Sequence, residues 1–171
     1  MKLLIVGNGS TGNKNNFDWY INNRTGEFLN NLKDSYNTEF FQLEIPFLEN
    51  DNLLNFGLVE NQISFSCISN LLSLKGLYII FRKVSEFDFC YLFFPGTLSR
   101  IIAIICLIVG KPFGLYVRGQ QYNKFKIDQL ILRNARFILT VSPNLSESML
   151  KLNQNTHVIR PMIDIGYSDL R

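Results

Sequence analysis

The sequence is poor in the residues that build metal centres and disulfide frameworks. It has one histidine, His157, and three cysteines among 171 residues. One imidazole cannot fill several ligand positions, so a histidine-based metal cluster and a dispersed catalytic triad are both disfavoured. Cys67, Cys90 and Cys106 lie far apart in apolar segments, a pattern typical of buried free thiols in a reducing compartment. We therefore expect no metal site.

Long apolar runs and long basic runs are also missing. The apolar stretch 101–109 is less than half of a membrane span, and the run Leu3–Val6 is too short for a signal peptide. The net charge of +3 comes without a Lys/Arg cluster of the kind found in nucleic-acid-binding arms. These absences predict a soluble, cytoplasmic protein that binds no nucleic acid.

What the sequence does contain is enough apolar material for one domain. Hydrophobic residues make up 47% of the chain and charged residues 18%, which is typical of a globular protein and not of a disordered one. A domain of this length buries roughly 70% of the surface that its unfolded chain exposes. We expect residues 1–164 to form a single domain and residues 165–171 to begin a linker.

Strand-like and helix-like segments alternate along the chain. We expect helices from Arg24 onward and over 61–85, 98–109, 124–134 and 143–152, and strands over 3–6, 38–43, 88–94, 113–117, 136–141 and 156–160. Thr97 or Ser99 is the expected cap of the third of these helices and Ser142 of the last. Such alternation predicts an α/β fold with a doubly wound, Rossmann-like parallel sheet and right-handed crossovers. The usual strand order, 3-2-1-4-5-6, makes the first and fourth strands neighbours.

A glycine-rich loop follows the first expected strand. Gly7–Gly12 matches the letters G-x-G-x-x-G of the dinucleotide-binding fingerprint. In that fingerprint the last glycine opens a helix, whereas here a loop-like, asparagine-rich stretch intervenes before Arg24. Glu44, after the second strand, stands where a ribose-binding acid would stand, but it is farther from the glycines than the motif expects. Phosphate binding by this loop is therefore left open.

Arg118 and Gly119 come directly after the apolar strand Phe113–Val117. In an open parallel sheet, ligands bind beyond the carboxyl ends of the strands. There a guanidinium and a nearby glycine present a hydrogen-bonding fork and an approachable backbone to an anionic or hydroxylated ligand. The alternative is an ordinary arginine that is solvated or forms a salt bridge.

Other strand ends converge on the same edge. We predict that one cleft at the carboxyl edge of the sheet is lined by the following residues: Gly9, Ser10, Thr11, Pro95, Gly96, Arg118, Gly119 and Gln120. These are acceptor-cleft candidates, and no catalytic residue is assigned among them.

The expected helix over 61–85 is apolar on most sides. A helix of this kind is either buried or in contact with another surface. Core packing explains its apolar residues, and peripheral contact with a membrane is the alternative because Lys75, Arg82 and Lys83 accompany them.

Four segments in the second half of the chain carry a resemblance to a known family. They are Asp88–Gly96, Gly110–Gly119 with its Gly-Lys-Pro start, Asn134–Pro143, and His157–Asp164. In order and spacing they resemble the amino-terminal, acceptor-side domain of family 4 glycosyltransferases, which have the two-domain GT-B fold. The resemblance covers roughly residues 88–164, and residues 1–12 in general form.

The resemblance implies an enzyme that moves a sugar from a nucleotide-sugar to an acceptor, with a saccharide or lipid-linked saccharide of surface polysaccharide biosynthesis as the expected acceptor. In that family the second domain binds the nucleotide-sugar donor. No second domain is in this sequence, so we expect the chain alone to bind no cofactor and to be inactive. Many members carry a histidine near the end of the fourth strand, where this chain has Arg118.

Two other classes remain open from the residues. The first is a nucleotide- or dinucleotide-binding Rossmann domain of an oxidoreductase, which the glycine loop favours and its context disfavours. The second is a non-catalytic sheet domain that only binds partners. The donor sugar, the acceptor and the linkage are not readable from the sequence.

Overall fold

The computed structural model describes residues 1–7, 11–13, 19–32, 37–46, 53–55, 64–68, 71, 73–119 and 125–159. Among the predicted site residues, Gly9, Ser10 and Gln120 lie outside the described residues. The expected domain end at residue 164 and the linker that follows also lie outside them.

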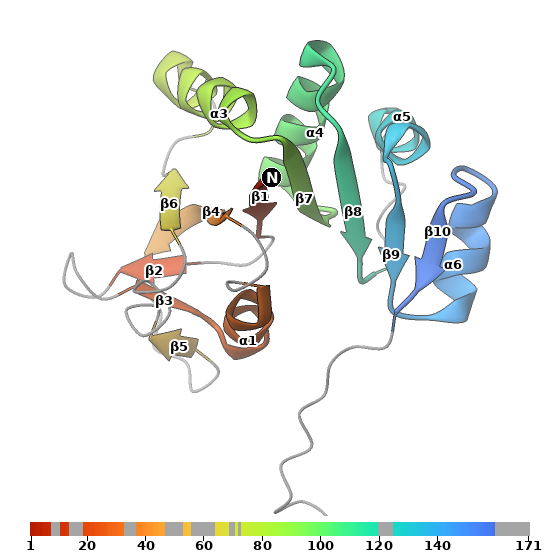
Figure 1. Ribbon diagram of the computed structural model, residues 1–171, viewed down its shortest axis with the longest axis horizontal. Coiled ribbons are helices and arrows are strands. Elements are labelled where there is room, and N and C mark those ends of the chain that lie inside the picture. The colour runs from red at the N-terminus through yellow and green to blue at the C-terminus, as the bar shows by residue number, and fades with distance from the viewer. Residues whose placement is uncertain are drawn as a thin grey trace, which may run out of the picture.

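A twisted parallel sheet forms the centre of the molecule (Figure 1). Its apolar segments form strands because β-branched and aromatic residues fit a pleated, buried surface. The strands, in their order across the sheet, are β6 (Ser64–Ile68), β4 (Asn37–Pro46), β1 (Lys2–Val6), β7 (Phe89–Phe94), β8 (Phe113–Val117), β9 (Ile138–Thr140) and β10 (Thr156–Val158). All pairs between these neighbours are parallel. The predicted doubly wound α/β class is confirmed.

One detail of the predicted topology is wrong. The strand next to β1 is β7, with Val6 opposite Leu92, and the Phe113–Val117 strand, predicted to adjoin the first strand, lies one strand farther away. The cause is β6, which occupies part of the stretch 61–85 that was predicted to be entirely helical. With β6 counted, the order of the sheet is the usual one, and β7 is the fourth strand.

A small antiparallel extension lies beyond the end of β1. It consists of β2 (Thr11–Asn13), β3 (Trp19–Asn22) and β5 (Leu53–Asn55), and β2 continues along the edge of β4 with Thr11 opposite Glu44. Gly12 is therefore part of a strand, and α1 (Asn23–Leu32) begins well after it. The predicted departure from the dinucleotide-binding fingerprint is confirmed.

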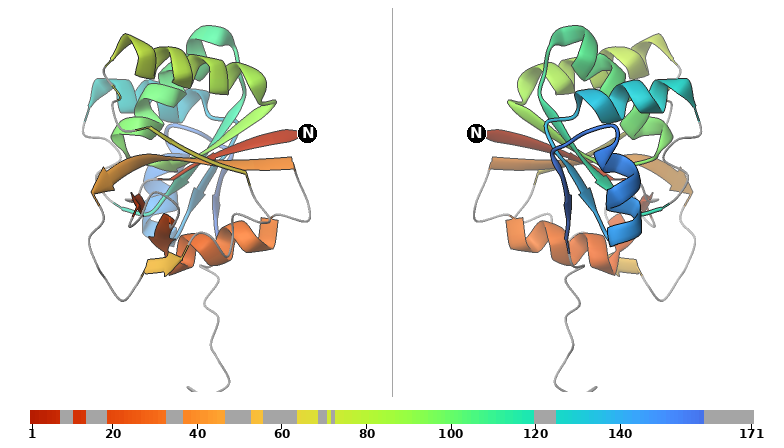
Figure 2. Two further views of the ribbon diagram at one scale, coloured as in Figure 1. Left: turned by 90° about the vertical axis from the view of Figure 1, so that its left-hand side faces the viewer. Right: turned by 90° about the vertical axis from the view of Figure 1, so that its right-hand side faces the viewer.

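Helices cover both faces of the sheet (Figure 2). On one face lie α3 (Leu74–Glu86), α4 (Thr97–Val109) and α5 (Lys126–Asn134), and α1 lies on the other. The fifth helix, α6 (Pro143–Leu150), contacts β9 and β10. Two separate apolar cores result, a larger one that includes residues of α3 to α6 and a smaller aromatic one beneath α1.

The sequence predicts a cap for two helix starts, and one of the two predictions is confirmed. Ser142 caps α6, with Pro143 in its first turn, and Ser73 accepts a hydrogen bond from the Gly76 N–H at 2.9 Å at the start of α3. The prediction for α4 is wrong, because Gly96 is its N-cap and makes no side-chain bond. Ser99 instead donates its hydroxyl to the Gly96 carbonyl at 3.0 Å.

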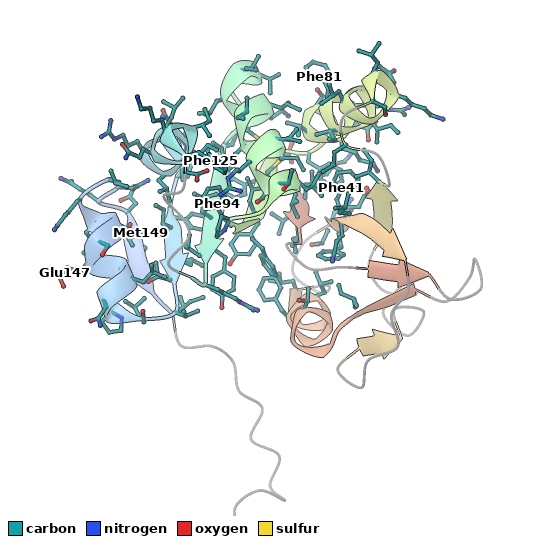
Figure 3. All side chains as sticks on the ribbon, turned by 180° about the vertical axis from the view of Figure 1, so that it is seen from behind. Phe41, Phe81, Phe94, Phe125, Glu147 and Met149 are labelled. Carbon is teal, nitrogen blue, oxygen red and sulfur yellow. The ribbon has the colours of Figure 1, made fainter. Side chains whose placement is uncertain are left out.

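The larger core is continuous from the sheet to the helices. Phe94 of β7 and Met149 of α6 lie between the helices and the strands, while Glu147 points away from the molecule (Figure 3). In the smaller core, Gly114 on β8 lies directly under the ring of Phe137, since a β-carbon at this position would come within 2.3 Å of it. The close approach requires glycine.

Candidate functional site

The carboxyl ends of the central strands meet at one edge of the sheet. Pro95 and Gly96 follow β7, while Arg118 and Gly119 follow β8, the next strand. Thr11 begins β2 beyond the end of β1. The described candidates therefore share one edge. The end of β1 is not directly beside Arg118 and Gly119, because β7 and its Pro95–Gly96 turn lie between β1 and β8. That these residues line one ligand cleft stays a prediction.

Arg118 is exposed, and its guanidinium lies over two aromatic rings. The guanidinium carbon is 4.8 Å from the centre of the Tyr116 ring and 5.7 Å from that of Phe93. Arg118 forms no ion pair with any other described residue, so the salt-bridge alternative finds no support there. Cation–π contacts of this kind contribute about 0.5–2 kcal/mol. They hold the guanidinium at the carboxyl edge while leaving its N–H donors available to a ligand.

Tyr91 lies behind this stack, in the same aromatic layer. Its ring contacts Phe28 of α1 and Phe93 at centroid distances of 5.8 Å in both cases. Burial, reinforced by the neighbouring Tyr116, raises the pKa of the Tyr91 hydroxyl well above its usual range. Tyr91 therefore keeps its proton and acts as a donor or packing group, and not as a base.

The start of α4 forms the middle of the edge. Gly96 is extended, with φ −154° and ψ 157°, the Phe94–Pro95 peptide bond is cis, and the first turn contains no acidic residue. Helix starts favour anions because their first N–H groups are unpaired and the helix dipole is positive there. This helix start lies one strand away from Arg118, so an anionic group near either position meets a positive potential.

A buried ion pair that the sequence did not reveal supports the same region. Arg100 of α4 donates to Asp128 of α5 at 2.7 Å and 3.2 Å, and the Asp128 residue is 0% exposed. The Phe125 N–H also donates to Asp128, and the Arg100 guanidinium stacks over the Phe125 ring at 4.9 Å. The partners are 28 residues apart, and no local pattern predicts their pairing. The cluster fixes the start of α5 against α4, beside the strand ends.

Gln42 is a second residue that sequence reasoning missed. It lies on β4 with 1% of its surface exposed, and its amide has no hydrogen bond with the described part of the chain. A sequence signal was present, because Gln42 is a polar residue between the apolar residues Phe41 and Leu43 of the expected strand 38–43. Glu44, the candidate ribose-binding acid, contributes its backbone to the pairing with β2.

Metal sites and membrane-spanning helices find no support among the described residues. Within the described ranges, no cluster of three or more His, Cys, Asp or Glu residues is suited to hold a metal ion. No helix in those ranges is both long enough and apolar enough to cross a membrane. A shallow polar depression lies at the opposite, amino edge of the sheet, lined by Lys2, Asn37, Glu39, Glu86 and Phe87, where doubly wound sheets do not usually bind ligands.

Comparisons with known proteins identify the fold but not a family. No family model matches the chain, and no curated protein matches its sequence. Among solved structures, S. aureus MnaA in a co-structure with UDP is similar over 92% of this chain and 43% of its own, with 14% identity and a TM-score of 0.56. MurG of Acinetobacter baumannii is similar over 95% of this chain and 46% of its own, with 12% identity and a TM-score of 0.54.

A third structure agrees with these two. A putative UDP-N-acetylglucosamine 2-epimerase from Listeria monocytogenes is similar over 88% of this chain and 41% of its own, with 12% identity and a TM-score of 0.50. The chain thus spans less than half the length of each of the three solved proteins. At this level of identity the likeness establishes that the chain has the Rossmann-like α/β fold of GT-B-type proteins.

Proposed function

We propose that this chain is the acceptor-side half of a GT-B glycosyltransferase that takes its sugar from a nucleotide-sugar. The observation that carries the proposal is the match between this single doubly wound sheet and less than half of larger proteins, one of them solved with UDP. The motif order over residues 88–164 supports the amino-terminal half and the family 4 type.

The proposal divides the chemistry between two halves. Transfer from a nucleotide-sugar requires stabilisation of the charge that develops on the departing diphosphate. Among the described residues assigned to this site, Arg118 and the start of α4 are an incomplete set for that purpose. We therefore assign the donor-binding groups to a carboxyl-terminal domain. The carboxyl edge of this sheet then binds the acceptor, and Arg118 is the residue we assign to acceptor contact. No metal is assigned to this half.

The acceptor we propose is a saccharide of surface polysaccharide assembly, carried on a lipid. The exposed face of α3 supports the lipid part of the proposal. Leu74, Leu77, Tyr78 and Phe81 lie on one side of that helix and are 89%, 39%, 64% and 49% exposed. Exposed apolar residues at this spacing, accompanied by the exposed base Lys75, are typical of a helix that lies on a membrane surface.

The oxidoreductase alternative is less well supported. A dinucleotide site of the Rossmann type needs the glycine loop to lead into a helix whose first N–H groups hold the pyrophosphate. Here the loop leads into β2, and α1 begins only at Asn23.

The test compares the full reading frame with the 171-residue chain. Both are assayed for release of nucleoside diphosphate from a panel of nucleotide-sugars, with lipid-linked saccharides from the source organism as acceptors. We expect acceptor-dependent release by the full-length protein and none by the chain alone. A reading frame without a second α/β domain, or full release by the chain alone, contradicts the proposal.

A further inference from the structure

Gln42 carries a buried amide without a hydrogen-bond partner. The residue is 1% exposed, and neither its Nε2 nor its Oε1 atom bonds to any other described residue. Removing an amide from water costs free energy unless other hydrogen bonds replace those to water. A buried polar group left in this state therefore points to a bound molecule or to a function.

Asn153 is a buried amide with a structural role, and it is fully hydrogen-bonded. The residue is 9% exposed, and its Nδ2 donates to the Leu132 carbonyl at 2.9 Å and to the Ala135 carbonyl at 2.7 Å. Its Oδ1 accepts from the Asn155 N–H at 2.9 Å. The Asn153 amide is thus satisfied at both ends by backbone groups, whereas the Gln42 amide is satisfied at neither end.

The Gln42 amide lies at the carboxyl edge, against the end of β1. A β-carbon at Gly7 would be 2.6 Å from Gln42 Oε1 and 2.6 Å from the ring of Phe40. Only glycine leaves room for the amide there. Gly7 also donates its N–H to the Phe41 carbonyl at 3.1 Å, so the backbone under the amide is fixed by the sheet.

Gly7 lies in the same row of the sheet as the two rings under Arg118. It is one position beyond the Val6–Leu92 pair and so level with Phe93 on β7, and Phe93 is directly opposite Tyr116 on β8. The Arg118 guanidinium lies over the rings of Phe93 and Tyr116. Three interstrand spacings, roughly 14 Å in total, separate β4 from β8. An uncharged amide and a cation therefore stand at opposite ends of one row, too far apart to bind the same group.

Amide chemistry limits what binds at the Gln42 end. The side chain offers donors and an acceptor without net charge. A phosphate or carboxylate has acceptors only and leaves Oε1 unsatisfied, whereas a hydroxyl or a carboxamide satisfies both ends. In a site shut off from bulk water, such neutral hydrogen bonds are strengthened.

We propose that Gln42 binds an uncharged hydroxyl or carboxamide group of a saccharide acceptor over Gly7, an inference that rests on the proposed function. Gln42 thus selects a neutral sugar group, while Arg118 is left to contact a charged or hydroxylated part of the same ligand.

The first experiment measures stability and needs no ligand. Gln42→Met replaces the amide by an apolar side chain of similar length, and Gln154→Met makes the same change at an exposed glutamine. We expect Gln42→Met to raise the Tm of the ligand-free chain by roughly 2–4 °C, with little change for the control. A lower Tm in Gln42→Met means that the amide already has a partner inside the protein and overturns the inference.

The second experiment observes the amide itself. The side-chain NH₂ resonances of Gln42, assigned by their absence from Gln42→Met, are followed by NMR as glucose, N-acetylglucosamine and other neutral hexoses are added at millimolar concentration. We expect at least one sugar to shift them and to bind Gln42→Met at least ten-fold more weakly than the parent chain. No shift at Gln42 with any sugar overturns the inference.

The NMR experiment distinguishes failure of the Gln42 proposal from failure of the proposed function. Sugar-dependent shifts of the Gly96 and Gly119 backbone resonances, without a shift at Gln42, reject the role of Gln42 and retain an acceptor site at the edge. The absence of sugar-dependent shifts at all of these positions counts against the proposed function as well.

Discussion

Arg118 differs from two other described arginines, Arg82 and Arg100, because it has no ion pair among the described residues. Arg100 is paired with the buried Asp128, and Arg82 is paired with Glu86 on the surface of α3. The Arg118 guanidinium has aromatic rings beneath it and no ion pair among the described residues. A cation held in place in this way, at the edge where parallel sheets bind ligands, is suited to contact a substrate.

Under the proposed function, Arg118→Ala in the full-length protein should lower turnover or raise the acceptor KM by about 10- to 100-fold, which corresponds to a charged hydrogen bond of roughly 1.5–3 kcal/mol. Arg136→Ala is the matched control, because Arg136 is also exposed but precedes β9 at the opposite edge. Steady-state kinetics measure the turnover and the acceptor KM of both variants. Unchanged kinetics for Arg118→Ala would return this residue to the role of a solvated surface arginine.

Arg100 should contribute mainly to stability. Arg100→Met leaves the carboxylate of Asp128, which is 0% exposed, without its counter-ion, and we expect a loss of about 3–5 kcal/mol in the free energy of unfolding. The double variant Arg100→Met/Asp128→Asn removes the unpaired charge and should lose less. Urea unfolding measures both, and equal losses would show that the charge of Asp128 is not the cause.

Cys90 should make the free energy of unfolding fall at alkaline pH. Its hydrogen bond with the Cys106 thiol, together with burial, raises the pKa of the Cys90 thiol far above its usual range. The unfolded chain loses this proton above about pH 8.5 while the folded chain keeps it. The stabilisation is therefore complete below that pH and is lost as the pH rises.

We expect the free energy of unfolding to fall by up to about 2 kcal/mol between about pH 8 and about pH 10 because of this thiol. Cys90→Ala should show a smaller fall over the same interval, whatever its stability at neutral pH. Urea titrations of both proteins at the two pH values provide the comparison. An identical fall in Cys90→Ala would assign the effect to other groups.

At the scale of elements, the sequence predicted most strands and helices because their signals are local. The Ser142-Pro143 start of α6 and the apolar strand Phe113–Val117 are examples of such signals. The strand β6 was missed because Ser64–Ile68 adjoins a longer apolar helix, and their patterns merge. That single error also misplaced the Phe113–Val117 strand relative to β1.

The candidate site was less predictable than the elements. Strand ends identify which residues reach the carboxyl edge, so Pro95, Gly96 and Arg118 were found in this way. Interactions between distant residues leave no such signal. The Arg100–Asp128 pair and the contact of Gln42 with Gly7 depend on strand register and crossover geometry. Local patterns in one sequence do not predict these.

The exposed face of α3 leads to a prediction at the same scale. If this face lies on a membrane, the full chain should co-sediment with anionic liposomes more than with neutral ones, because each basic residue near an anionic surface contributes about 1 kcal/mol. Phe81→Ser should weaken binding, whereas Leu130→Ser on α5 should not, although both parent residues are 49% exposed.

Two results would contradict the membrane proposal. Equal sedimentation with both lipids would remove its electrostatic part, and equal loss in Phe81→Ser and Leu130→Ser would show that α3 is not a specific surface. Lys75→Glu offers a further check, because it reverses an exposed charge on the same helix. It should reduce binding to anionic liposomes only.

At the scale of the whole molecule, the chain has its own apolar cores. Two apolar clusters lie on the two faces of the sheet, so the 171-residue chain is expected to fold by itself. The carboxyl edge carries Arg118 and the helix start at Gly96, which together leave a diphosphate largely uncompensated. Under the proposed function, we therefore assign donor binding to a second domain.

Calorimetric titration of the folded 171-residue chain with nucleotide-sugars and dinucleotides tests that division most directly. We expect no micromolar binding of any of them, because the proposed function assigns the groups that hold the diphosphate to a second domain. Micromolar binding of a nucleotide-sugar would place the donor site in this chain and contradict the account. Micromolar binding of NAD or NADP would contradict it in favour of an oxidoreductase domain.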